Sequence, residues 1–299
     1  MNALFVVLLL TPPGALVKIP SPGDLVAAVR GNDDVEIERV AARIGAVRLE
    51  AWAEHGKPAE RLAALRALPL VGDAWFVLPE LAKLLADGDD EVALRAAECA
   101  RRIAESLTPE DKERDEMPAD VPARAARELV AIAQRATLKP AVRTSAIEAV
   151  AALRGLTRVD DKALVALLAD GDVVIRRAAA EALAQAPAGE KALVETLAKD
   201  ASPDVASAAA ASLCRDVPVI APSSGKASAG EARAARIGGA ARDRLRALAL
   251  DEKVSLADRL DLIGCLRVAK KDADQKVLDE LARKPPDSLR SRARSLGGR

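Results

Sequence analysis

The stretch DKALVALLADGDVVIRRAAAEALAQ, residues 161–185 of a 299-residue chain, decides the fold. Its first half places three leucines on one helical face, because residues three and four apart share a face: Leu164, Leu167 and Leu168. Asp170-Gly171-Asp172 then predicts a turn, and the alanine-rich half over 178–186 gives a second apolar stripe. The stretch therefore predicts a helical hairpin with two apolar stripes.

The same hairpin recurs along the chain. Residues 190–216 repeat it with Val205 in the place of Ile175, an offset of 30, and residues 78–106 carry the turn Asp87-Gly88-Asp89. Looser copies of the second helix occur at 31–47, 58–68, 139–153 and 256–266. Two helices per unit at such spacings predict an all-α fold, an α-solenoid of antiparallel helical hairpins.

The pattern from Asp170 to Leu183 reads Asp-x-Asp, two residues, aliphatic, Arg, x, then Ala-Ala-Ala-x-Ala-Leu. It resembles the HEAT repeat of the bilin-lyase type. The resemblance implies a ladder between neighbouring repeats, made by the turn aspartate and the arginine of the second helix. This carries over to Asp170 and Arg176, whereas Ala93 and Ala206 hold the arginine position in two other units.

Composition agrees with close helix packing and argues against several kinds of active site. The chain has 66 Ala but only 1% aromatic residues, and small side chains let helices approach closely. A single histidine excludes metal centres built on several histidines, including those of the family's hydroxylases. His55 is interpreted as a helix-end residue, and the pairs at 33–34, 89–90 and 160–161 as helix caps. No catalytic residue, cofactor or metal site is predicted.

Four segments are expected. Residues 1–15 contain an apolar run at 3–10 of the length found in a signal peptide, but no positive charge precedes it. They are therefore interpreted as a signal peptide or, alternatively, as a short N-terminal helix. Residues 16–215 form the HEAT-like array, 216–232 a Pro/Ser/Gly-rich loop, and 233–299 C-terminal helical repeats with a basic cap. A transmembrane segment is not expected, and a periplasmic or secreted protein is favoured over a cytoplasmic one.

Two of the three cysteines are candidates for a disulfide. Aligning Arg259 with Ala206 maps Cys265 onto Ser212, two residues from Cys214, on helices expected to be neighbours. The alternative is a pair of buried thiols. Cys99 occupies a core position of its helix.

The net charge of zero conceals an asymmetry. Residues from 226 onward carry 18 basic and 11 acidic side chains, and the residues before them 27 and 34. The densest basic piece is the tail with Arg283, Lys284, Arg290, Arg292, Arg294 and Arg299. It is interpreted as a solvated cap or, alternatively, as a nucleic-acid-binding end.

The function predicted from these features is a non-catalytic scaffold for protein–protein interactions, whose partner is an unknown protein or peptide. Aromatic anchors for that partner are Trp52, Trp75 and Phe76, with core packing as the alternative. A nucleic-acid-binding protein and a lyase-like enzyme are the other hypotheses. A lyase would need a pocket for a large chromophore, and few aromatics are present to line it.

Overall fold

The structure is a computed structural model that describes residues 19–110, 117–184, 186–215, 217, 228–268, 272–283 and 286–297. It divides into unit 1, up to Val77, and unit 2, from Leu78 onward. This boundary falls inside the segment 16–215 that the sequence suggested as one array. The predicted N-terminal segment 1–15 and most of the loop 216–232 lie outside the described residues.

Unit 1 consists of short helices joined by tight turns: α1 (Pro22–Gly31), α2 (Asp34–Ile44), α3 (Ala46–His55), α4 (Pro58–Ala67) and the 3-10 turns η2 (Leu68–Leu70) and η3 (Ala74–Val77). The junctions use left-handed backbone at Asn32, with φ 55°, and at Gly45, with φ 80°. Glycine adopts this conformation without a steric penalty, so α2 and α3 follow each other directly. α4 packs against both α1 and α3.

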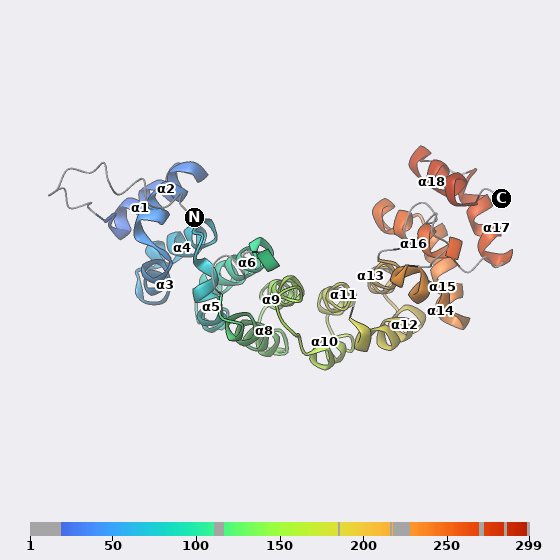
Figure 1. Cartoon of the computed structure of the whole chain (residues 1–299), viewed down its shortest axis with the longest axis horizontal. Coiled ribbons are helices and arrows are strands. Elements are labelled where there is room, and N and C mark those ends of the chain that lie inside the picture. Colours follow the sequence, from blue (N-terminus) through green and yellow to red (C-terminus); the bar gives the residue numbers. More distant parts are fainter. Residues whose placement is uncertain are drawn as a thin grey trace. The chain divides into compact units, whose positions relative to one another are not determined.

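Unit 2 is a row of helical hairpins (Figure 1). The first helices of the hairpins are α5 (Leu78–Leu84), α8 (Asp120–Ala133), α10 (Asp161–Leu167), α12 (Glu190–Lys199), α15 (Gly239–Leu250) and α17 (Asp272–Leu281). Their partners, the second helices, are α6 (Asp90–Ser106), α9 (Pro140–Leu153), α11 (Val173–Ala182), α13 (Pro203–Cys214), α16 (Leu256–Val268) and α18 (Asp287–Gly297).

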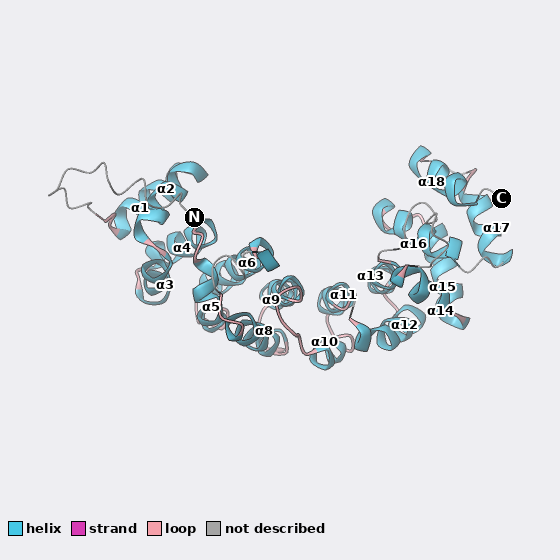
Figure 2. Ribbon diagram, in the orientation of Figure 1, coloured by secondary structure: helices cyan, strands magenta, loops and turns pink. Residues whose placement is uncertain are grey.

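The second helices form a continuous layer, because each contacts the next from α6 to α18. Figure 1 shows α6, α9, α11 and α13 along one side of the row and α5, α8, α10 and α12 along the other. Figure 2 shows helices and loops, without strands, throughout the part of the chain that the structure describes. The α-solenoid prediction is confirmed in unit 2, where helical hairpins stack in sequence order.

Alanine accounts for the close stacking of the second helices. Fully buried alanines line the contacts between them: Ala96, Ala97, Ala100, Ala146, Ala149, Ala179, Ala180 and Ala209. Larger aliphatic side chains such as Ile103, Ile147 and Ile175 fill the remaining space. Both stripes of each hairpin are therefore covered, one by the partner helix and one by the next hairpin.

The acidic pairs at helix starts act as caps, as the sequence predicts. Asp33 accepts hydrogen bonds from the backbone N–H groups of the first turn of α2, Asp89 from those of α6, and Asp160 from those of α10. These carboxylates satisfy amides that have no partner within the helix.

The C-terminal helices differ in one respect from the sequence-based expectation. The predicted loop 216–232 ends earlier than expected, because α14 (Ala229–Arg236) begins inside it, and α15 follows after Ile237 and Gly238. The backbone is extended at Ile237, which ends α14, and at Gly238, which precedes α15, and Gly239 starts α15 with φ 53°. α14 is an additional helix that packs on both α13 and α16.

Candidate interaction surface

Ion pairs join successive hairpins of unit 2. Arg143 in α9 binds Asp170 in the turn before α11, at 2.5 Å. Arg176 in α11 binds Asp200 in the turn before α13, at 2.8 Å. The arginine of one repeat therefore pairs with the turn aspartate of the next. The predicted residues Asp170 and Arg176 both belong to this ladder, but they do not form an ion pair with each other, because each pairs with a residue of another repeat. The hydrogen bond from Arg176 to Asp170 goes to the backbone carbonyl, at 3.0 Å.

Sequence reasoning missed the other two ladder residues. Arg143 stands 33 residues before Arg176, and Asp200 stands 30 after Asp170, so the repeat spacing itself could have identified them. Burial alone would raise the pKa of Asp200, but hydrogen bonds from Arg176 and from the Ser202 N–H hold it below its usual value. The pKa of Asp170 is likewise lowered, chiefly by its hydrogen bond from Arg143.

The exposed side of the second-helix layer carries a line of charged groups. We name as the carboxylate row the acidic side chains that follow one another across these helices: Glu105 on α6, Glu148 on α9, Glu181 on α11, Asp204 on α13, and Asp258 and Asp261 on α16. Arginines lie among them, with Arg101 3.5 Å from Glu148 and Arg177 2.9 Å from Glu181. Arg177 also lies within electrostatic range of Asp204 and Asp258, which connects α11 to α13 and α16.

Two carboxylates of the row have raised pKa values although arginines lie near them. Burial, reinforced by the charges of Glu105 and Glu181, raises the pKa of Glu148, and Arg101 offsets only part of this effect. Partial burial and the charge of Asp258 raise the pKa of Asp261 against the influence of Arg292 and Arg215. These two carboxylates are partly buried next to other acidic side chains, and a cation brought close to them would lower their pKa values.

The repeat spacing also contains a signal for this surface that was overlooked. Glu98, Glu148 and Glu181 each stand five residues after the ladder position of their repeat. Apolar side chains on the same helical faces are exposed beside the charges: Leu94 is 44% exposed on α6, and Val174 is 51% exposed on α11. The surface therefore combines carboxylates with exposed apolar side chains.

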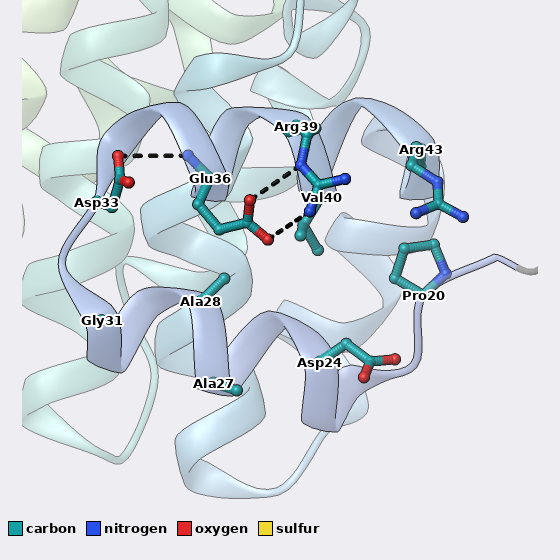
Figure 3. A pocket seen from close by; sticks show the side chains of 10 residues that line it. All are labelled: Pro20, Asp24, Ala27, Ala28, Gly31, Asp33, Glu36, Arg39, Val40 and Arg43. Atoms are coloured by element: carbon teal, nitrogen blue, oxygen red, sulfur yellow. Dashed lines mark hydrogen bonds and ion pairs between the residues drawn. The ribbon is translucent and has the colours of Figure 1, made fainter.

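A pocket of about 620 Å³ lies in unit 1 between α1 and α2 (Figure 3). Its charged lining residues already bind one another: Glu36 accepts two hydrogen bonds from Arg39, and Asp33 caps the start of α2. The hydrogen bond from Arg39 lowers the pKa of Glu36, as expected for an exposed ion pair. Across the described residues, groups of three or more His, Cys, Asp or Glu side chains suited to a metal ion are not found.

The predicted aromatic anchors lie in unit 1. Trp52 is half-buried in α3, and Trp75 meets Phe76 edge to face at 5.9 Å between ring centroids. Phe76 is 55% exposed, so it is the most accessible of the three rings. The structure does not assign these residues to the layer that carries the carboxylate row, and their role in binding stays a prediction. His55 lies at the end of α3, 3.5 Å from Glu54.

The structure joins Cys214 at the end of α13 to Cys265 in α16 by a disulfide, with the Cα atoms 5.5 Å apart. Both residues are buried. Cys99 is buried in α6, and burial raises the pKa of its thiol far above the usual value.

Many of the C-terminal arginines make internal contacts. Arg242 is 1% exposed and binds Asp274 together with the carbonyls of Ala234, Cys265 and Leu266. Further arginines bind carboxylates or carbonyls, namely Arg233, Arg236, Arg246, Arg259 and Arg267. In the tail Arg290 pairs with Asp287 and Arg292 lies near Asp261, while Arg283 and Arg294 are exposed. Lys284 and Arg299 lie outside the described residues. Much of the basic excess is therefore structural.

No family model matches the sequence, and no curated protein matches it significantly. A designed armadillo repeat protein is similar in structure, with a TM-score of 0.43, 17% identity, and coverage of 84% of this chain and 98% of the other. An engineered protein has a TM-score of 0.42 and 17% identity, covering 92% and 87%. The complex of CpcE and CpcF of phycocyanin lyase from Nostoc sp. PCC7120 has a TM-score of 0.36 and 18% identity, covering 90% and 96%. None of the described helices is long and apolar enough to cross a membrane.

Proposed function

We propose that the protein is a non-catalytic scaffold that binds a basic segment of a protein partner along the second helices of unit 2. The carboxylate row is the observation that carries this proposal. It crosses consecutive helices from α6 to α16, and burial together with neighbouring carboxylates raises the pKa values of Glu148 and Asp261 despite the nearby arginines. A lysine- or arginine-rich segment would supply positive charge, while its apolar side chains would meet Leu94 and Val174.

The nucleic-acid-binding alternative is less well supported. Phosphates would be repelled by the carboxylate row, and the C-terminal arginines that suggested this alternative are largely bound within the protein. A lyase-like enzyme is also disfavoured. The pocket between α1 and α2 is lined by small, charged and aliphatic side chains, without the aromatic rings that a chromophore would contact.

Titration with short peptides tests the scaffold proposal. Fluorescence anisotropy would compare a lysine- and arginine-rich 15-residue peptide, a glutamate-rich peptide of equal length and a DNA duplex. The variant Glu148→Gln/Asp258→Asn/Asp261→Asn is expected to bind the basic peptide at least tenfold more weakly, about 1.4 kcal/mol. The wild-type affinity should also fall with added salt.

A matched control removes the same number of carboxylates from the first helices: Glu128→Gln on α8, Glu195→Gln on α12 and Asp279→Asn on α17. This variant is expected to keep the wild-type affinity within about twofold, since its net charge equals that of the test variant. Equal losses in both variants, or tighter binding of the duplex than of the basic peptide, would refute the proposal.

We further propose that the protein acts in the periplasm or outside the cell rather than in the cytoplasm. The Cys214–Cys265 disulfide supports this location, because disulfides persist in oxidising compartments. Fractionation of native cells followed by immunoblotting tests it. Recovery of the chain in the cytoplasmic fraction would contradict the proposal.

A further inference from the structure

The ladder of unit 2 lacks its arginine in two of the second helices. The arginine position holds Arg143 in α9, Arg176 in α11 and Arg259 in α16, but it holds alanine at Ala93 in α6 and at Ala206 in α13. Arg143 and Arg259 also share a second contact, since the Nε of each donates to the carbonyl ten residues earlier, at 2.8 Å and 3.0 Å. This correspondence identifies Ala206 as the position from which the arginine of the α13–α16 joint is missing.

At Ala206 the acceptor side of the step is present, whereas residues 134–139 before α9 contain no carboxylate that an arginine at position 93 could bind. Asp170, Asp200 and Asp251 each accept a hydrogen bond at 2.8–2.9 Å from the backbone N–H two residues later, in the turn before a second helix. Asp170 and Asp200 also bind the arginine of the preceding repeat. Alanine at 206 cannot reach Asp251, so the α13–α16 joint lacks this ion pair.

The disulfide lies at this same joint. Cys214 is on α13, eight residues after Ala206, and Cys265 is on α16, six residues after Arg259. The additional helix α14 is inserted between these hairpins. Its contacts across the joint are the Glu231–Arg267 pair at 2.9 Å and the bond from Arg233 to the Arg215 carbonyl at 2.8 Å.

We propose that the Cys214–Cys265 disulfide is a redox-dependent lock that takes the place of the missing ladder step and holds α13 against α16. With the bond formed, this joint resists opening as the ladder joints do. A dithiol reductant transfers two electrons and two protons to the bond, which yields two thiols and converts the dithiol into a disulfide. The α13–α16 joint then becomes the first part of unit 2 to open.

The burial of the bond determines when reduction takes place. Cys265 is fully buried and Cys214 is 6% exposed, so a reductant acts on molecules in which the joint has opened transiently. The lock is therefore set during folding and is stable afterwards in an oxidising environment. Opening of this joint also affects the carboxylate row, because the row passes from Asp204 on α13 to Asp258 on α16 at this joint.

Hydrogen exchange with mass spectrometry on the full chain tests the lock, independently of any ligand. After reduction by a dithiol, peptides from α13 and α16 are expected to exchange at least tenfold faster, while peptides from α6 and α9 keep their rates. The variant Cys214→Ser/Cys265→Ser should reproduce the reduced protein, and Cys99→Ser should match the oxidised wild type.

A second variant tests the equivalence of lock and ladder. Arg176→Met, with the disulfide intact, is expected to accelerate exchange at the α11–α13 joint by a similar factor and to spare α16. Reduction that leaves α13 and α16 unchanged, or that accelerates every helix of unit 2 equally, would overturn the proposal. Because the reduced wild type has no substitution, the test stands even if the double variant fails to fold.

Discussion

Arg176 of one repeat donates to both carboxylate oxygens of Asp200 in the next, from Nε at 2.8 Å and from a terminal nitrogen at 3.2 Å. The two side chains are 16% and 9% exposed, so this pair is largely shielded from water. It contrasts with the neighbouring Arg177–Glu181 pair, whose side chains are 50% and 44% exposed.

The contrast predicts different stabilities for two adjacent substitutions. Arg176→Met should lower the free energy of unfolding by about 2 kcal/mol, because it leaves Asp200 partly buried without its charged partner. Arg177→Met should change it by about 0.5 kcal/mol or less, as is usual for exposed pairs. Urea denaturation followed by circular dichroism measures both. Equal effects would show that the ladder contributes no more than a surface ion pair.

The ladder also predicts acid sensitivity. The pKa values of Asp170 and Asp200 are lowered in the folded protein. Their contribution to the free energy of unfolding is therefore complete above the pKa of an aspartate in the unfolded chain, about 3.9. It is lost as the pH falls through the lowered values. The urea midpoint should therefore drop between pH 5 and pH 2, with a smaller drop in Asp200→Asn. An identical pH dependence in the variant and the wild type would contradict this assignment.

Glu148 is expected to behave in the opposite sense. Its pKa is raised, so its contribution to stability is present below the unfolded value and is lost as the pH rises through the folded one. Glu148→Gln should thus stabilise the protein slightly at pH 7. Because the site is half-exposed, the free energy of unfolding should rise by no more than about 0.5 kcal/mol, which a small increase in melting temperature would show. The difference should vanish near pH 3.

Glu98→Gln is the matched control, because Glu98 holds the same repeat position and pairs with Arg95 at 2.8 Å. It should not be stabilising at pH 7. A stabilising Glu148→Gln that also weakens peptide binding would indicate that the charge is retained for function at the expense of stability. A destabilising effect at pH 7 would show that Arg101 compensates Glu148 fully.

Cys99 should be inert in the native protein. Burial raises the pKa of its thiol, and the thiolate is the reactive form. Iodoacetamide at pH 8 is expected to add nothing to the folded chain and one group after unfolding without reductant, as measured by intact mass. Addition of one group to the folded protein would contradict the burial of Cys99 in α6.

The fold was accessible from the sequence because the repeat encodes it locally. The leucines and alanines of 161–185 have the same helical period wherever the hairpin recurs, and capping aspartates mark the starts of α10 and α11. The break between α14 and α15 at Ile237 and Gly238 was missed, since the helical pattern continues on both sides of it. Gly239 starts α15 with φ 53°, a backbone conformation that side-chain periodicity does not report.

The candidate surface was less accessible, for a physical reason. The charge asymmetry suggested a basic C-terminal cap or, alternatively, a nucleic-acid-binding end, but Arg242 and Arg259 are buried and bind carbonyls and carboxylates inside the fold. Composition counts charges without showing which ones are compensated. The carboxylate row becomes visible only when Glu148, Glu181 and Asp258 are seen on neighbouring helices.

The measurement that tests the central claim most directly is a hydrogen-exchange footprint of the basic peptide on the full-length, oxidised protein. If the second helices bind the partner, exchange should slow in peptides from α9, α11, α13 and α16, and the first helices α8, α10 and α12 should keep their rates. Protection confined to the first helices or to unit 1, or no protection at a saturating peptide concentration, would contradict the account.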